Sequence, residues 1–96
     1  MKYKINYEKQ AEKDLEKLDI ESQNIILEAI EIIENQGIEY VTTRYLGKKL
    51  YEIKASYMRA IYKYKDNQII LVGVIFKKKS QKTPKNIIER AEKILT

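Results

Sequence analysis

Cationic side chains in the second half of the chain are the residues best suited to chemistry. An apolar run at residues 69–76 ends in three consecutive lysines, 77–79, and Arg59 interrupts a second apolar segment. The chain has no histidine and no cysteine, so it lacks the commonest general base, the commonest metal ligand and any thiol nucleophile. We therefore expect any catalysis to depend on Lys, Arg, Tyr or carboxylate groups, without a metal ion or other cofactor.

The two signs of charge are separated along the sequence. Residues 8–39 carry ten carboxylates and three lysines, whereas residues 44–85 carry twelve Lys or Arg residues and two carboxylates. The net charge of +5 conceals this asymmetry. A basic segment of this kind indicates a polyanionic partner, and RNA, DNA or an acidic protein would each fit.

If the partner is RNA and the chain cleaves it, the reaction requires a base to free a 2′-hydroxyl, cations to stabilise the phosphorane and an acid for the leaving 5′-oxygen. We expect Arg59 to bind the scissile phosphate. Lys54 precedes a turn predicted at Ser56 and lies about as far from it as Arg59 does, so the two side chains should face each other across a hairpin. Repulsion between the two cations would favour loss of the lysine proton, which makes Lys54 a candidate base. Lys77 is the third catalytic candidate.

Further lysines and two tyrosines could contact RNA, the tyrosines by stacking on a base or by donating a proton. Strand alternation would place Lys77 and Lys79 on one face of the sheet and Lys78 on the other, and either face could hold RNA. The candidate RNA-binding residues are Lys48, Lys49, Lys78, Lys79, Lys82, Tyr57 and Tyr62.

Each of these features also has a purely structural interpretation. A lysine run at a strand exit often only protects an exposed sheet edge. Arg59 could simply pair with Glu52 on a neighbouring strand. Most of the eight tyrosines would serve as core or interface residues with solvated hydroxyls.

The first third of the chain predicts a strand and two helices. Residues 3–7 alternate apolar and polar side chains, and residues 8–18 place Ala11, Leu15 and Leu18 on one helical stripe. Asp19 is the expected N-cap of a second helix that runs to about residue 36, and Gly37 is expected to close it in a left-handed conformation. Residues 38–45 are expected to form a linker, with a turn at Gly47.

The rest of the chain predicts three strands and a helix. Strands are expected at residues 49–55, 57–65 and 68–76, with turns at Ser56 and at Asp66-Asn67. Thr83 and Pro84 are typical of an N-cap and first turn, and they should begin the last helix. The predicted fold is α+β, in the order β-α-α-β-β-β-α, with an antiparallel sheet packed against a helical hairpin and followed by a C-terminal helix.

The length of 96 residues predicts one domain, residues 1–96, with a modest core. No apolar stretch approaches the roughly 18 residues that span a bilayer. The first residues lack the apolar centre of a signal peptide. We therefore expect a cytoplasmic protein with no membrane partner.

Three segments in the second half resemble one family. They are Leu-Tyr-Glu-Ile-Lys at residues 50–54, Tyr-Met-Arg-Ala-Ile-Tyr at 57–62 and Phe-Lys-Lys-Lys-Ser-Gln-Lys-Thr-Pro at 76–84, followed by Ala91. Together they resemble the RelE/ParE toxin superfamily and, within it, the phage-derived HigB-like branch. The sequence departs from the usual pattern at Lys54, where an arginine is typical, at Tyr57-Met58, and at Ser80, where threonine is common. A lysine at position 54 loses the bidentate fork, so its grip on phosphate should be looser.

This resemblance implies a microbial-RNase-like fold and a role as the toxin of a type II toxin–antitoxin pair. Such a toxin would be a ribosome-dependent endoribonuclease that cuts translated mRNA. Its partners would be the ribosome, the mRNA and a helix-turn-helix antitoxin from the adjacent gene. Two alternatives belong to other classes: an inhibitor of DNA gyrase like ParE, and a non-catalytic nucleic-acid-binding module.

Overall fold

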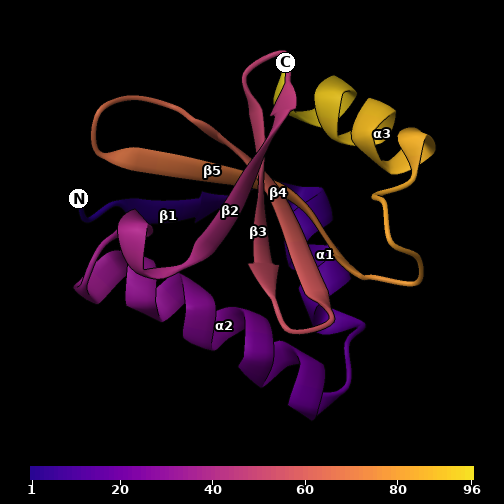
Figure 1. Cartoon of the computed structure of the whole chain (residues 1–96), viewed down its shortest axis with the longest axis horizontal. Coiled ribbons are helices and arrows are strands. Elements are labelled where there is room, and N and C mark those ends of the chain that lie inside the picture. Colours follow the sequence, from indigo (N-terminus) through magenta and orange to yellow (C-terminus); the bar gives the residue numbers. More distant parts are fainter.

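The computed structural model describes all residues, 1–96, as a five-stranded sheet with three α-helices (Figure 1). The strands lie in the order β1-β5-β4-β3-β2. Their bounds are β1 Lys4–Tyr7, β2 Thr42–Gly47, β3 Leu50–Ala55, β4 Met58–Tyr64 and β5 Ile69–Lys77, and the helices are α1 Lys9–Glu16, α2 Ile20–Asn35 and α3 Lys85–Leu95. The predicted α+β class is confirmed.

One predicted linker is a strand. Residues 38–45 were expected to be irregular, but they form a short 3₁₀-helix at Ile38–Tyr40 and then enter β2, which pairs antiparallel with β3. The strand contains two threonines and a tyrosine, which favour extended backbone. As an edge strand it is mostly exposed, so it lacks the apolar alternation that marks a half-buried strand. The element order therefore has one strand more than predicted.

The sheet is mixed, which also differs from the prediction of an antiparallel sheet. β1 runs parallel to β5, and the other three pairings are antiparallel. Antiparallel neighbours here are joined by short turns, whereas the chain travels through both helices and three strands between β1 and β5. A connection of that length permits a parallel neighbour.

The acidic helices form as predicted. The Asp19 side chain accepts a hydrogen bond from the backbone N–H of Ser22 at 3.2 Å, which caps α2. The buried stripe of α2 consists of Ile26, Ala29, Ile30 and Ile33, with Ser22 at its start. Gly37 follows the helix with φ of 133°, a value that glycine tolerates best, although its ψ of 157° is not that of a left-handed helical residue.

Two apolar clusters hold the helices to the sheet. The larger packs α1 and α2 against one face and includes Ile26, Ile53 and Met58. The smaller lies under α3 and includes Leu50, Ile61 and Leu95. Figure 1 shows α3 apart from the other two helices. Alternate residues of β3 and β4 therefore belong to different environments, which decides where each cation points.

Two predicted turns can be compared with the structure. Ser56 has φ of 54° in the two-residue turn between β3 and β4, as expected. The cap of the last helix is shifted by one residue, because the carbonyl of Pro84 accepts from the N–H groups of Ile87 and Ile88. Thr83 is therefore not the N-cap, and its hydroxyl is bonded elsewhere. No helix is long and apolar enough to cross a membrane.

Candidate nucleic-acid interface

The candidate site is centred on Glu52, whose side chain is 1% exposed in the middle of β3. The Thr83 hydroxyl donates a hydrogen bond to Glu52 Oε2. Arg44 of β2 lies directly opposite Glu52, with Nη2 at 3.6 Å from Oε1. Arg59 of β4 approaches the same oxygen from the other side, with Nε at 3.9 Å. A buried carboxylate thus holds two arginines on one face of the sheet.

Arg59 is fixed in place by the backbone around it. Its Nη1 donates to the carbonyl of Ser56 at 2.7 Å and to that of Met58 at 2.8 Å. The side chain is only 8% exposed. The structural alternative, in which Arg59 pairs with Glu52, therefore has support, and part of the guanidinium stabilises the turn after β3. Because the group is rigid and positive, it also provides a preorganised charge at the base of the site.

Lys54 is the cross-strand partner of Arg59 in the β3–β4 pair. The predicted juxtaposition of these two cations is therefore confirmed. Alternation along β3 puts Lys54 on the face of Glu52, and it is half-buried. The cations on this face are thus Arg44, Lys54 and Arg59, with one carboxylate among them, and the surplus of positive charge suits a phosphate.

The structure does not bring Lys77 to this group. Lys77 is paired with Met58, whose side chain lies in the core beneath α1 and α2. Its Nζ lies 2.8 Å from Asp19 Oδ1, and 6.0 Å from the centroid of the Tyr57 ring. The hydrogen bond to Asp19 raises the pKa of Lys77, and the same bond lowers that of Asp19. The expectation that Lys77 acts beside Arg59 and Lys54 is not supported, because strand alternation turns it to the other face.

The remaining lysines of the basic tail are exposed in the loop between β5 and α3. β5 ends at Lys77, so the predicted alternation does not extend to Lys78 and Lys79. Lys79 lines a groove of about 390 Å³ with Phe76, Lys77, Pro84 and Ile87. Lys82 lies in the same exposed loop. These lysines carry long, flexible cationic side chains, and the loop that holds them leads to Thr83, which contacts Glu52.

Two predicted RNA contacts lie at the far end of β3. Lys48 and Lys49 form the β2–β3 turn, whereas Lys54 and Arg59 lie beside the β3–β4 turn. Lys48 Nζ is 3.1 Å from Glu92 Oε2 on α3. These lysines are exposed, but they do not belong to the same cluster as Arg59.

The two predicted tyrosines differ. The Tyr57 hydroxyl is 2.9 Å from Ser22 Oγ, and Ser22 Oγ also donates to Asp19 at 2.8 Å, so Tyr57 belongs to the Lys77 side. Tyr62 is fully buried, and burial raises the pKa of its hydroxyl strongly. A direct contact between Tyr62 and RNA does not fit this structure, because a core ring cannot stack on a base.

Sequence reasoning missed Arg44 and the role of Thr83. The predicted linker includes Arg44, although the sequence Thr42-Thr43-Arg44-Tyr45 is compatible with a strand. Thr83 was assigned to a helix cap. The sequence indicates Glu52 only as a possible partner that neutralises Arg59. No group of three or more His, Cys, Asp or Glu side chains could hold a metal ion.

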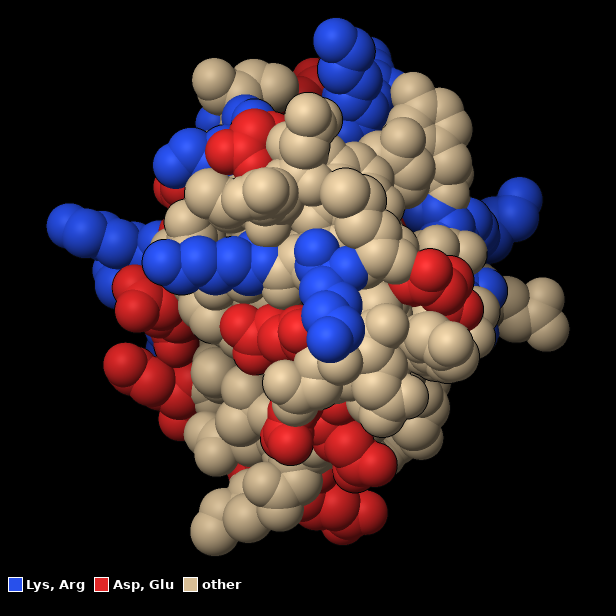
Figure 2. All heavy atoms as spheres, turned by 90° about the vertical axis from the view of Figure 1, so that its left-hand side faces the viewer, with Lys and Arg blue, Asp and Glu red and all other residues tan.

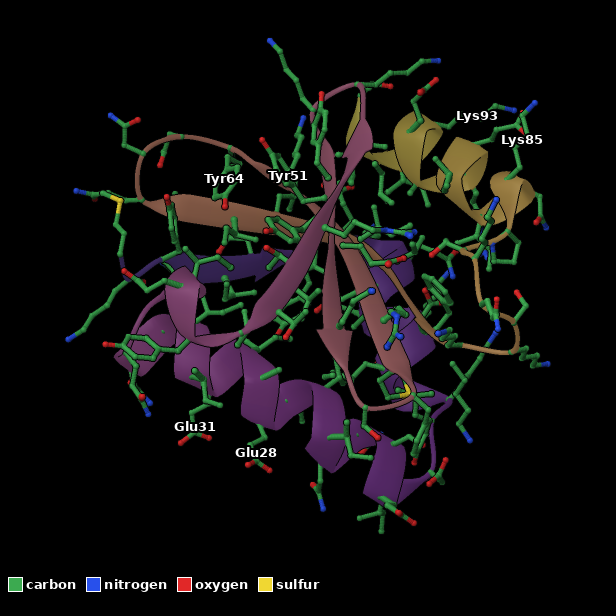
Figure 3. All side chains as sticks on the ribbon, viewed as in Figure 1. Glu28, Glu31, Tyr51, Tyr64, Lys85 and Lys93 are labelled. Atoms are coloured by element: carbon green, nitrogen blue, oxygen red, sulfur yellow. The ribbon has the colours of Figure 1, made fainter.

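The charge separation of the sequence is visible on the surface. Figure 2 shows one face of the molecule with Asp and Glu gathered mostly in its lower half and Lys and Arg in the upper half. Figure 3 shows Glu28 and Glu31 of α2 pointing away from the sheet, with Lys85 and Lys93 on α3 at the other side of the molecule. The acidic helices and the basic strands therefore present separate surfaces.

Comparisons with known proteins agree with this fold. Residues 13–96 match the family model described as phage derived protein Gp49-like (DUF891). A double arginine-to-alanine variant of the E. coli toxin RelE in the free state is similar over 97% of both chains, with 21% identity and a TM-score of 0.69. RelE in the archaeal RelE–RelB complex from Pyrococcus horikoshii has 21% identity and a TM-score of 0.63, covering 85% of this chain and 100% of that one. A chain of the Mycobacterium tuberculosis RelBE2 toxin–antitoxin complex has 13% identity and a TM-score of 0.64, covering 81% and 100%. None of the curated proteins matches the sequence significantly.

Proposed function

We propose that this chain, which belongs to the Gp49-like family of phage-derived proteins and has the RelE fold, is the toxin of a type II toxin–antitoxin pair and cleaves mRNA on the ribosome. The observation that carries the proposal is the cluster of Arg44, Lys54 and Arg59 on one sheet face, organised around the buried carboxylate of Glu52. The similar solved structures include complexes described as toxin–antitoxin pairs, which supports an antitoxin partner. The chain would be a single toxin domain.

The chemistry would be transfer of the phosphoryl group within the RNA. The 2′-oxygen attacks phosphorus, the bond from phosphorus to the 5′-oxygen breaks, and the products are a 2′,3′-cyclic phosphate and a free 5′-hydroxyl. Arg59 would stabilise the charge that develops on the non-bridging oxygens, because it is held rigidly by two backbone carbonyls. Lys54, its cross-strand partner, is less constrained. It would either accept the proton of the attacking 2′-hydroxyl or donate a proton to the leaving 5′-oxygen.

Glu52 would act as a positioning residue in this scheme. Its carboxylate holds the Arg59 and Arg44 guanidinium groups and receives the Thr83 hydroxyl, so it links three segments of the site. The exposed lysines at positions 78, 79 and 82 would bind the phosphates that flank the cleaved one. The helix-turn-helix antitoxin expected from the adjacent gene would neutralise the toxin by binding it.

Expression in a bacterium tests the toxin assignment. The gene is placed under a tightly controlled promoter, with and without its neighbouring gene, and growth is followed together with the integrity of abundant messages. Growth arrest that the neighbour relieves, accompanied by broken messages, supports the proposal. Arrest with whole messages and a DNA damage response would instead support a gyrase inhibitor, and unimpaired growth with RNA binding in vitro would support a non-catalytic binding module.

A further inference from the structure

Five tyrosines form a continuous row at one end of the sheet. The ring centroids of Tyr45 and Tyr51 are 5.0 Å apart, those of Tyr51 and Tyr64 are 5.1 Å apart, and those of Tyr3 and Tyr64 are 5.2 Å apart. Tyr62 lies 5.5 Å from both Tyr51 and Tyr64. Five of the eight tyrosines in the chain are thus gathered in one place. We call this set, Tyr3, Tyr45, Tyr51, Tyr62 and Tyr64, the tyrosine row.

The sheet register explains how the row is held. Tyr45 of β2 lies opposite Tyr51 of β3, and Tyr51 lies opposite Tyr62 of β4. Tyr64 is two residues beyond Tyr62 and therefore shares its face. Figure 3 shows Tyr51 and Tyr64 near each other, between the β4–β5 loop and strand β2. Three strands contribute rings, and Tyr3 adds one from the residue just before β1. The row is therefore held rigidly, and little conformational entropy is lost when it binds a ligand.

Two rings of the row, one of them at its end, are open to solvent. Tyr45 is 58% exposed and Tyr64 is 37% exposed, whereas Tyr62 is fully buried beneath them. Tyr51 stacks on Tyr62 with 23° between the ring planes. The Tyr45 hydroxyl accepts a hydrogen bond from the backbone N–H of Lys49, which fixes the outermost ring against the β2–β3 turn. Large rings that are both exposed and immobilised are typical of binding surfaces.

The charges around the row are mainly positive. Four exposed lysines lie close to the row in the sequence. Lys49 is in the β2–β3 turn that follows Tyr45, Lys65 comes directly after Tyr64, and Lys2 and Lys4 flank Tyr3. Of the nearby carboxylates, Glu39 pairs with the amino terminus and Asp66 accepts from the N–H of Gln68, whereas Glu34, which lines a pocket with Lys2 and Tyr3, forms no ion pair. A row of aromatic rings bordered by free lysines matches single-stranded nucleic acid, whose bases stack and whose phosphates are anionic.

The edge strand β2 connects the row to the candidate site on the other face. Arg44 and Tyr45 are consecutive residues of β2, so their side chains point to opposite faces of the sheet. Arg44 contacts the Glu52 cluster, and Tyr45 belongs to the row. No further strand lies outside β2. A single strand of RNA that passes over this edge would therefore reach both surfaces.

We propose that the exposed rings of the tyrosine row, Tyr45 and Tyr64, bind bases of the single-stranded message by stacking, a few nucleotides from the phosphate held at Arg59 and Lys54. This inference rests on the proposed function for the identity of the RNA, but the binding itself can be measured without ribosomes. Stacking on an exposed ring tolerates any base, so the row would add affinity and not sequence preference. Binding would weaken as salt rises, because the bordering lysines contact phosphates.

The test is RNA binding by the full chain and its variants. The probe is a fluorescein-labelled oligouridylate of about a dozen nucleotides, read by anisotropy, and the same strand annealed to oligoadenylate serves as a duplex in which the bases are not free. Because the chain has eight tyrosines and no tryptophan, its intrinsic fluorescence comes from tyrosine, and the part of the RNA-induced quenching that is lost in Tyr45→Ala or Tyr64→Ala reports on the row. Circular dichroism checks that each variant is folded.

Tyr45→Ala and Tyr64→Ala should each weaken binding to the single strand by between about fivefold and about a hundredfold, the range for loss of one stacked base. Tyr45→Phe and Tyr64→Phe should retain binding, since they keep the rings. Tyr40→Ala is the matched control, because Tyr40 is 65% exposed but lies outside the row. Equal binding by the alanine variants and the native chain would overturn the inference.

Two other results separate this inference from the proposed function. If the alanine variants keep their RNA affinity but no longer bind the antitoxin, the row is a protein interface and the inference is wrong. If they lose RNA affinity while the native chain leaves messages whole on ribosomes, the row binds RNA as proposed and the endoribonuclease assignment fails instead.

Discussion

Lys54 and Arg59 lie directly opposite each other across the β3–β4 hairpin, on the face of the sheet that also carries Glu52. They differ in what holds them. Arg59 is nearly buried and donates to two backbone carbonyls, whereas Lys54 is half-buried and forms no ion pair. The pair therefore combines one fixed charge with one adjustable charge, which suits a site that must bind a phosphate and also move a proton.

This difference predicts unequal effects on stability. Arg59→Ala should lower the free energy of unfolding by about 2 kcal/mol, because it removes charged hydrogen bonds to the Ser56 and Met58 carbonyls. Lys54→Ala should change it by no more than about 0.5 kcal/mol. Urea unfolding followed by circular dichroism measures both. Equal stabilities for the two variants would contradict a structural role for Arg59.

Glu52 should be required for the stability of the site. Glu52→Gln leaves the neighbouring guanidinium groups without their carboxylate, and we expect a loss of about 2 kcal/mol, moderated because Arg44 is partly exposed. Thr83→Val removes the hydroxyl that Glu52 accepts. A double-mutant cycle on these two positions should give a coupling energy, and purely additive effects would show that the hydrogen bond contributes nothing.

The Asp19–Lys77 pair predicts a dependence of stability on pH. The hydrogen bond from Lys77, together with those from Ser22, lowers the pKa of the Asp19 carboxyl. The stability that Asp19 contributes is therefore present above its unfolded pKa of about 3.9 and is lost as the pH falls through the lower folded value. The raised pKa of Lys77 gives a contribution that is present below about pH 10.4 and is lost as the pH rises through the folded value.

Asp19→Asn is the sharp test of this pair, because asparagine also caps helices and only the charge is removed. Thermal unfolding of the native chain and this variant is compared across the pH range. We expect their difference in midpoint to be largest near neutral pH and to shrink at both the acidic and the alkaline ends. A difference that does not vary with pH would mean that the pair is not coupled to folding.

Close packing of α3 on β5 depends on Gly73. A Cβ at this position would lie 2.7 Å from Leu95 Cγ, so Gly73→Ala must displace the Leu95 side chain, which anchors the end of α3. We expect a loss of about 1–3 kcal/mol from overpacking, with faster hydrogen exchange in Lys85–Leu95. Adding Leu95→Ala to Gly73→Ala should cost less stability than the sum of the two single substitutions, since the clash disappears. A Gly73→Ala variant with native exchange rates in α3 would contradict this packing.

The parts of the structure that the sequence predicted are those set by local patterns. The pairing of Lys54 with Arg59 follows once the turn is placed at Ser56, because both residues are counted from the same turn. The Asp19 cap and the apolar stripe of α2 are local in the same way. Charge separation likewise needs only the order of residues.

The parts that could not be predicted depend on contacts distant in sequence. Arg44 reaches Glu52 only because an edge strand with little apolar alternation pairs with β3. Thr83 reaches it through a loop whose path no local pattern specifies. Lys77 could be assigned a face only from the register of β5 on β4, which pairs it with Met58 and turns it towards Asp19. Spacing in the sequence, without this register, predicts that Lys77 lies with Lys54 and Arg59.

The most direct measurement uses a defined bacterial translation reaction with purified protein, and message ends are mapped by primer extension with ribosomes present or omitted. The native chain is compared with Lys54→Ala and with Lys93→Ala, a control that removes an exposed lysine on α3. We predict cleavage only with ribosomes, a rate for Lys54→Ala lowered by about 10²- to 10⁴-fold, and no change for Lys93→Ala. Whole messages with the native chain, or equal cleavage by Lys54→Ala, would contradict an endoribonuclease site at Lys54 and Arg59.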